Sequence, residues 1–364
     1  MDEYTFLQVV WFILISILWL GYFVLEGFDF GVGMLVRTVG RTRAERRAVI
    51  HSIGPVWDGN EVWLLVAGGA TFAAFPQWYA TLFSGFYLAL FLILFGLIIR
   101  NVSFEFWGKA ETDAGRERWE WAMVLGSALP ALLWGVGWAN IVHGVPIDGD
   151  MEYTGNLIDL LNPYALLGGV TTLAVFLTHG AIFLNLKTKG DIGERARGIA
   201  ARTAPVAALL GTAFLVWTVL AHGGGVDLAS AIAAAGAVLA LGAAAVLAGR
   251  NPLRAFYATT AGIMAFFLAL FIDLFPHTMV SSTSAAFDMT LNQSASSNYT
   301  LTVMTVVAVL LVPVVLAYQA WTYWVFRHRV SAEDFGEVRN PLDLLDKDKR
   351  EGAGGEPKPA GPGS

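Results

Sequence analysis

The chain has 364 residues, of which 56% are hydrophobic, 13% aromatic and only 14% charged, with a formal net charge of −6. This composition is too apolar for an ordinary soluble domain, and a mean hydropathy of +0.58 agrees with that conclusion. The sequence has no cysteine, which excludes disulfides, thiolate metal sites and cysteine nucleophiles. We therefore expect an all-α, polytopic membrane protein.

Nine apolar segments each come close to the ~20 residues that cross the hydrocarbon core of a bilayer. They lie at 6–25, 55–75, 77–99, 120–142, 163–186, 203–221, 227–249, 254–275 and 299–326. The first segment has no Lys or Arg before it and no small-residue cleavage site, so it indicates a retained helix and not a signal peptide. Residues 1–330 are predicted to form one nine-helix transmembrane domain. The charged and then Gly/Pro-rich segment 331–364 is predicted to be a disordered cytoplasmic tail.

The Lys and Arg residues are confined to alternate connections between these segments. All 23 of them fall in 37–47, 100–118, 187–202, 250–254 and the sequence after 326. Because basic residues are enriched in cytoplasmic loops, this pattern places the N-terminus outside and the C-terminus in the cytoplasm. The two ends can lie on opposite sides only if the number of spans is odd.

The start of the second segment carries two carboxylates, Asp58 and Glu61, in the stretch Gly-Pro-Val-Trp-Asp-Gly-Asn-Glu-Val-Trp-Leu (54–64). Their spacing of three puts both on one face of a helix. A carboxylate pair entering a bilayer is costly, so a proton path is the functional hypothesis. The alternative is that Asp58 only caps free N–H groups at the start of the helix and interacts favourably with the positive end of the helix dipole.

Two further acidic residues, Glu26 and Asp29, lie on one face of the inner half of the first helix. They are candidates to extend the same proton path. The alternative is that both form hydrogen bonds within the bundle, to Asn60 or to arginines of the next loop.

Small and aromatic residues near these carboxylates are predicted to serve helix packing. Gly27 and Gly31 form a Gly-x-x-x-Gly motif that allows another helix to approach closely in lipid, and Gly33 follows it. Trp57, next to Asp58, is also expected to pack between helices.

An internal similarity suggests a repeat. Glu26-Gly27 in the first helix and His179-Gly180 in the fifth are each followed by a basic segment containing a glycine and several arginines. The pattern predicts two four-helix units plus one final helix in the same membrane orientation, with chance similarity as the alternative.

The histidines do not indicate a metal or haem site. No two of them lie at i, i+4 within a predicted helix, and Cys-x-x-Cys-His is absent. His179 is expected to be a hydrogen-bonded core residue. The sequence also has no Walker loop, nucleotide fingerprint or zinc motif, and we expect no nucleic-acid partner.

The sequence resembles subunit II of the cytochrome bd-type quinol oxidases. The resemblance depends on Glu-Gly-Phe-Asp-Phe-Gly-Val-Gly-Met-Leu (26–35), on 54–64, and on Ala-Gly-Gly-Ala (67–70). Later matches run in order from Phe-Ser-Gly-Phe-Tyr (83–87), Tyr-Thr-Gly-Asn (153–156) and Leu-Asn-Pro (161–163) to Phe-Pro (275–276), Ser-Ser-Thr (281–283) and Leu-Thr-Val-Met-Thr (301–305). They extend over all of the chain except the tail.

The resemblance implies a haem-free subunit of the bacterial plasma membrane, paired with a subunit I that holds haems b and d, oxidises quinol and reduces O₂ to water. The resemblance is also compatible with small accessory subunits in the complex. The family's proton-path aspartate matches Asp58, and its first-helix acidic pattern matches Glu26 and Asp29. Members of the family often carry Asp in place of Glu26 and Gln in place of Glu61, which leaves the role of Glu61 open.

Two other classes of function are consistent with the residues alone. Intramembrane carboxylates, glycine-rich helices and parallel repeats also describe proton-coupled transporters. In a purely structural membrane scaffold, the carboxylates would only fix helix packing.

Overall fold

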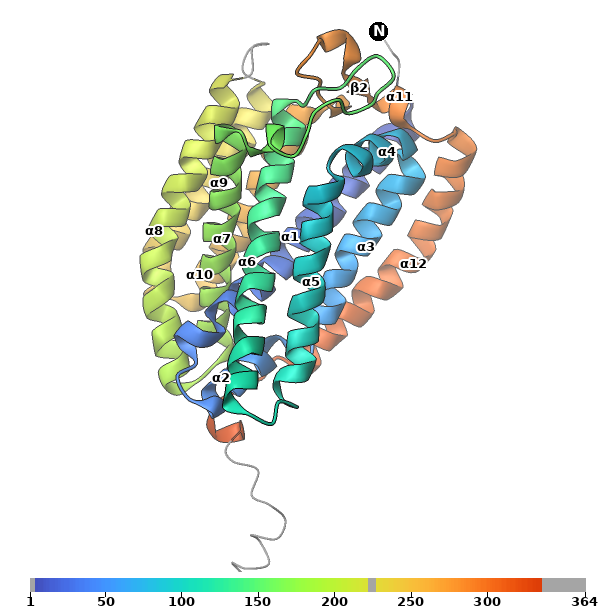
Figure 1. Ribbon diagram of the computed structural model, residues 1–364. Helices are drawn as coiled ribbons and strands as arrows, with labels where there is room; N and C mark the ends of the chain where they lie inside the picture. The colour runs from blue at the N-terminus through green and yellow to red at the C-terminus, as the bar shows by residue number, and fades with distance from the viewer. Residues whose placement is uncertain (1–3, 222–226, 336–364) are drawn as a thin grey trace, which may run out of the picture.

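The computed structural model describes residues 4–221 and 227–335. Its long helices run side by side in one bundle, with short elements at both ends (Figure 1). Within the described residues, eight helices are long and apolar enough to cross a membrane. They are α1 (Phe6–Val39), α5 (Tyr87–Trp107), α6 (Asp113–His143), α7 (Pro163–Lys187), α8 (Gly190–Ala221), α9 (Leu228–Leu247), α10 (Pro252–Leu274) and α12 (Asn298–Val325). The predicted all-α class is confirmed.

The second predicted span corresponds to α3 (Trp57–Ala74), which is not one of these eight helices. Its first turns carry Asp58, Asn60 and Glu61, and these polar residues make its start less apolar than the rest. The predicted count of nine spans therefore stays a prediction.

The third predicted span, 77–99, differs from the structure in its boundaries. It is divided at Phe86 into α4 (Pro76–Gly85) and α5, and α5 continues beyond residue 99. Arg100, which was predicted to begin a loop, is therefore inside a helix, and its side chain is fully buried. The prediction was wrong because the helix does not end at its first charge. Arg100 instead finds acidic partners within the bundle.

The basic segment 37–47, predicted to be a loop, is largely helical. α1 runs to Val39, and α2 (Arg43–Ile53) follows it closely. A capping box explains the start of α2: the Glu45 N–H donates to Thr42 Oγ1 (3.2 Å), and the Thr42 N–H donates to Glu45 Oε2 (3.0 Å). The segment 187–202 likewise belongs mostly to α8.

Short elements close the end of the bundle that holds the N-terminus (Figure 1). They are η1 (Asp159–Leu161), η2 (Ala285–Phe287), α11 (Leu291–Ser294) and a two-stranded antiparallel sheet of β1 (His277–Met279) and β2 (Met289–Thr290). In the sheet, His277 is paired with Thr290 and Met279 with Met289.

The chain after α12 stays attached to the opposite end. The Val330 N–H donates to the Lys187 carbonyl (2.8 Å), and η3 (Glu333–Phe335) brings the Phe335 ring within 4.8 Å of His51. Residues 331–335 of the predicted tail therefore contact the bundle. Residues 336–364 lie outside the described part of the chain.

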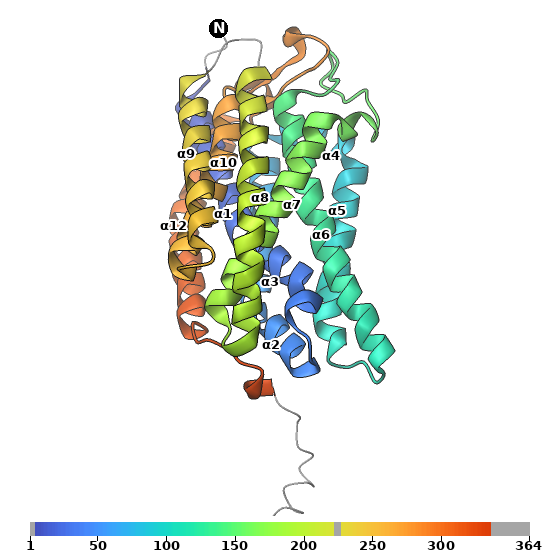
Figure 2. The same cartoon turned by 90° about the vertical axis from the view of Figure 1, so that its left-hand side faces the viewer.

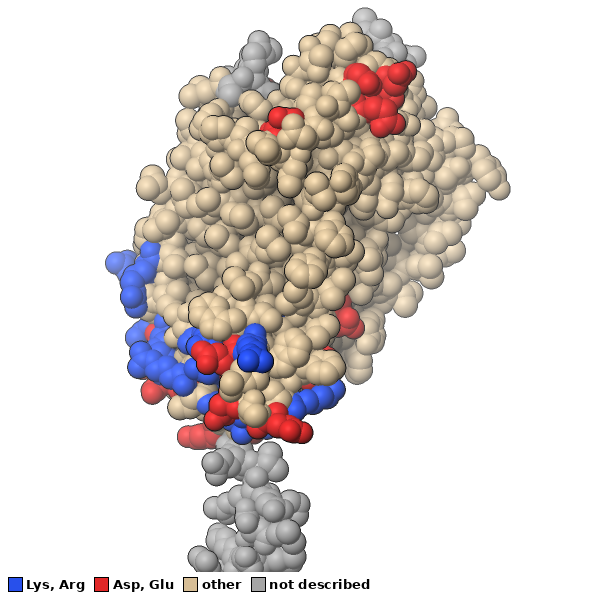
Figure 3. Space-filling model, in the orientation of Figure 1, with Lys and Arg blue, Asp and Glu red and all other residues tan. Residues whose placement is uncertain are grey.

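α1 occupies the centre of the bundle and packs against α3, α6, α7 and α10. On one side of it α7, α8, α9 and α10 pack on one another, and on the other side α5 packs on α6 (Figures 1 and 2). Lys and Arg gather at the end that holds α2, whereas Asp and Glu occur at both ends (Figure 3). The acidic residues of α1, Glu26 and Asp29, are fully buried inside the bundle, away from this charged surface.

Glycines allow α1 to approach its neighbours closely. A Cβ atom at Gly31 would lie 2.2 Å from the Phe176 carbonyl oxygen and 2.6 Å from the Gly180 Cα, both on α7. A Cβ at Gly27 would lie 2.7 Å from the Phe176 ring, and one at Gly33 would lie 2.0 Å from Ser127 Oγ on α6. At Gly31 the obstacle is backbone, so a side chain there could fit only if one helix moved.

We expect Gly31→Ala to lower the thermal unfolding temperature of the purified protein complex. Overpacking costs about 1–3 kcal/mol and sometimes more, and the backbone contact leaves little room for relaxation. Gly242→Ala in α9 is the matched control, because a Cβ there meets nothing within 4 Å. Equal unfolding temperatures for the two variants would contradict the close approach of α1 and α7.

Candidate functional site

The candidate site is built around Arg100 of α5, which lies between carboxylates from two other helices. The side chains of Arg100 and Glu26 have no solvent exposure, and they form an ion pair between α5 and α1. Glu61 of α3 places its Oε2 atom 3.4 Å from Arg100 Nη2, and its side chain keeps 20% exposure. One guanidinium therefore joins α1, α3 and α5, and one of its two carboxylate partners is accessible from outside the bundle.

Neighbouring side chains fix the position of this ion cluster. Asn101 Nδ2 donates to Glu61 Oε2 at 2.7 Å. The Arg100 guanidinium carbon lies 4.9 Å from the ring centre of Phe30 and 5.7 Å from that of Phe104. These aromatic faces stabilise the cation and exclude water from it.

Asp29 lies one turn after Glu26 on α1, and its hydrogen-bond partner is an amide and not a cation. Asn60 Nδ2 donates to Asp29 Oδ2 at 2.7 Å, as the alternative interpretation of the sequence suggested. The Tyr323 hydroxyl of α12 donates to Asn60 Oδ1 at 2.7 Å, and Gln319 Nε2 lies 3.4 Å from the same oxygen. Trp63 Nε1 donates to Gln319 Oε1 at 2.8 Å. The network ties α12 to α1 and α3.

Asp58 is not part of this cluster. It lies in the first turn of α3 with an exposed side chain, and it forms no hydrogen bond or ion pair within residues 4–221 and 227–335. Trp57, beside it, is half-buried and packs against Phe104 with ring centres 5.5 Å apart. The structure thus brings together three of the four predicted proton-path residues, Glu26, Asp29 and Glu61, and leaves Asp58 on the surface one turn before Glu61.

A second charge cluster lies nearer the basic end of the bundle. The buried Glu120 accepts hydrogen bonds from Arg37 (2.9 Å) and Arg46 (2.8 Å). Glu45 is paired with Arg195 at 2.6 Å. Burial alone would raise the pKa of the Glu45 carboxyl, but the hydrogen bonds from Arg195 and from backbone N–H groups outweigh it and hold the pKa below its ordinary value. These carboxylates are paired with arginines and join helices.

His179 is buried in the core. Its Nδ1 atom lies 2.7 Å from Thr259 Oγ1, and its ring stacks on Phe256 with centres 4.7 Å apart. Across the described residues, no group of three or more His, Cys, Asp or Glu residues could hold a metal ion.

The roles of Arg100, Asn101 and Gln319 were not predicted from the sequence, whereas Asn60 was named as a possible partner of the first-helix carboxylates. One signal was available: four carboxylates were predicted inside helices without a cation, and a buried carboxylate needs a partner. Arg100 directly follows an apolar segment and was the nearest candidate along the third span. Asn101 and Gln319 gave no comparable signal because isolated amides are common in helices.

Comparisons with known proteins agree with this architecture. A family model for cytochrome bd terminal oxidase subunit II matches residues 7–326. The cytochrome bd ubiquinol oxidase subunit 2 of Bacillus subtilis (strain 168) is 39% identical over 333 residues, covering 90% of this chain and 98% of the relative. The cytochrome bd-I ubiquinol oxidase subunit 2 of Escherichia coli (strain K12) is 38% identical over 372 residues, covering 92% and 98%.

The fold is also similar to a solved structure. A chain of the bd oxidase from Geobacillus thermodenitrificans aligns with a TM-score of 0.70 at 16% identity, covering 88% of this chain and 99% of that one. The similarity extends over nearly the whole bundle, in which the carboxylates and Arg100 lie. From the family match and the identity to its relatives, the chain belongs to the family of cytochrome bd terminal oxidase subunit II.

Proposed function

We propose that this chain is subunit II of a quinol oxidase complex, in which it supports the reduction of O₂ to water by a partner subunit I. Membership of the family over residues 7–326 and the names of its relatives support this assignment. The eight candidate spans and the family make it a multi-pass protein of the bacterial inner membrane. In this proposal haems b and d lie in subunit I, and this chain holds none.

The chain's own contribution is to conduct protons from the cytoplasmic side toward subunit I. The observation that carries this proposal is the pairing of the buried Arg100 with Glu26 and Glu61, with Asp29 beside them. The reduction of O₂ consumes protons, and carboxylates exchange protons whereas a guanidinium does not. Glu61, which is partly exposed, links the surface to the buried Glu26. Asp58, one turn earlier on α3, receives protons from water.

We expect Asp58→Asn to leave assembly intact and to slow quinol-driven oxygen uptake by about tenfold or more, because an amide keeps the volume but cannot carry a proton. Oxygen uptake is measured per assembled complex, with haem content as the normaliser. Glu105→Gln is the matched control, since Glu105 is an exposed carboxylate near the end of α5. Glu61→Gln should be milder, because the resemblance indicates that an amide is acceptable there.

Unchanged turnover and unchanged proton uptake in a fully assembled Asp58→Asn complex would contradict the path. In that case Asp58 would only interact with the free N–H groups and the dipole at the start of α3.

Arg100→Gln should destabilise the complex strongly, because it leaves Glu26 buried without a cation. Removing one partner of a buried ion pair costs about 3–5 kcal/mol. The double variant Arg100→Gln/Glu26→Gln should recover part of the lost unfolding temperature. A double variant no more stable than Arg100→Gln alone would show that the two side chains do not depend on each other.

We also propose nine membrane spans, with α3 as the ninth, an outer N-terminus and a cytoplasmic C-terminus. The gathering of Lys and Arg at one end of the bundle supports this orientation (Figure 3). The grouping of α7–α10 on one side of α1 supports two four-helix units plus α12.

The orientation is tested by cysteine labelling, for which this cysteine-free chain provides no background. Cysteines at the exposed positions Arg41 and Asp191 should react only with a reagent supplied from the cytoplasm, and a cysteine at Asp150 only from outside. Labelling of subunit II is measured in intact cells and in inverted vesicles. The reverse pattern would overturn the orientation, and with it the direction of the proton path.

A proton-coupled transporter remains the alternative class for a bundle with buried carboxylates. Proton or solute flux by this chain alone in liposomes would support the transporter. Quinol-dependent oxygen uptake that copurifies with a haem-bearing partner would support the oxidase.

A further inference from the structure

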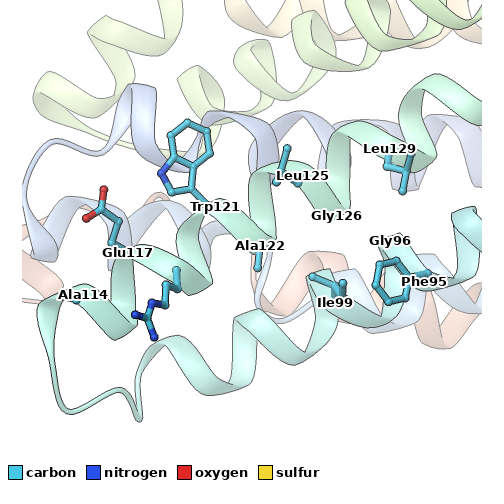
Figure 4. Close-up of a pocket in the computed structure, with 11 residues that line it drawn as sticks. Phe95, Gly96, Ile99, Ala114, Glu117, Trp121, Ala122, Leu125, Gly126 and Leu129 are labelled. Atoms are coloured by element: carbon cyan, nitrogen blue, oxygen red, sulfur yellow. The ribbon is translucent and has the colours of Figure 1, made fainter.

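A groove on the outer surface between α5 and α6 is not used by the proposed proton path. It has a volume of about 700 Å³. Its apolar lining residues, labelled in Figure 4, are Phe95 and Ile99 of α5 and Ala122, Leu125 and Leu129 of α6. Both helices are candidate membrane spans, so the groove lies at the depth of the bilayer.

The floor of the groove is formed by backbone. A Cβ at Gly126 would lie 2.7 Å from the Gly96 carbonyl oxygen and 2.9 Å from the Arg100 backbone nitrogen. The backbones of α5 and α6 are therefore in contact at Gly96 and Gly126, where neither helix has a side chain. Any occupant of the groove covers the stretch of α5 backbone that leads to the buried ion cluster.

The mouth of the groove carries an uncompensated positive charge. Glu117 Oε1 is paired with Arg37 Nη2 at 2.8 Å, and the Arg37 guanidinium packs over the Trp121 ring at 4.8 Å. The neighbouring Arg118 is exposed and forms no ion pair within the described residues. A cation beside a tryptophan at a helix end is typical of the membrane interface, where an anionic group can reach it.

The length of the groove along α6 matches the hydrocarbon thickness of one leaflet of a bilayer. From Arg118 to Leu129, α6 rises about 16 Å at about 1.5 Å per residue. Half of the hydrocarbon core is about 15 Å. A lipid with its phosphate at Arg118 would therefore extend one acyl chain along the whole groove, past Trp121 and Leu125 to Leu129.

We propose that this groove binds an anionic phospholipid of the leaflet at the basic end of the bundle, with its phosphate at Arg118 and one acyl chain between α5 and α6. The anionic lipids of that leaflet complement the free arginine, and the hydrocarbon complements the apolar walls. The acyl chain seals the Gly96–Gly126 floor and keeps water away from the backbone beside Arg100. The inference goes beyond the proposed function, since the site exists whether or not the cluster conducts protons.

The test uses the purified oxidase complex in nanodiscs that contain phosphatidylglycerol with a photoactivatable diazirine in one acyl chain. Crosslinked residues are located by mass spectrometry. We expect crosslinks on α6 between Trp121 and Leu129, and about five-fold fewer with phosphatidylcholine carrying the same probe. Arg118→Gln should reduce the phosphatidylglycerol crosslinks about five-fold, equivalent to the ~1 kcal/mol of one arginine near an anionic surface.

Arg250→Gln is the matched control, because Arg250 is exposed at the same end of the bundle, after α9. It should leave the groove crosslinks unchanged. The absence of crosslinks in the groove, equal crosslinking by the two lipids, or equal losses in the two variants would each overturn the proposal. None of these results depends on oxygen uptake, so a failed proton path would not be mistaken for a missing lipid site.

Discussion

The burial of Arg100 is the constraint on which much of this structure depends. A guanidinium without solvent exposure inside a membrane bundle is tolerated only when carboxylates meet it. Glu26 supplies the buried partner and Glu61 the partly exposed one, so α1, α3 and α5 must come together at one depth. The close approach of α1 to α7 through Gly31 and Gly180 holds the other side of α1 in place.

The same side chains hold the helices together and are the candidates to move protons. Asn60 joins Asp29 to Tyr323, and this polar network connects the centre of the bundle to α12, whose residues are otherwise mostly exposed. In the proposed path, a substitution in the cluster would therefore change packing and proton exchange at once. Variants that remove a charge but keep volume and hydrogen bonding separate these two effects, which is why amides are the informative replacements.

The helices could be predicted from the sequence, whereas the cluster could be predicted only in part. The length of the apolar segments determines where a chain can cross a bilayer. The helix α2 was not predicted, because its residues were assigned to a basic loop, although Thr42 and Glu45 have the spacing of a capping box. Spacing placed Asp58 and Glu61 on one face, but only tertiary packing decides that Glu61 reaches Arg100 while Asp58 stays exposed. Arg100 was missed because a charge at the end of an apolar segment was interpreted as the start of a loop.

The central claim is that the buried carboxylates take up and release protons during turnover. Infrared difference spectroscopy between the reduced and the oxygen-reacted complex tests it most directly, since protonated carboxylic acids absorb separately from the amide backbone. The account predicts a change in the carboxylic acid band that is lost or shifted in an assembled Glu26→Gln complex. An identical carboxylic acid band in the wild type and in that variant would show that Glu26 keeps one protonation state throughout, and that the cluster only holds the helices together.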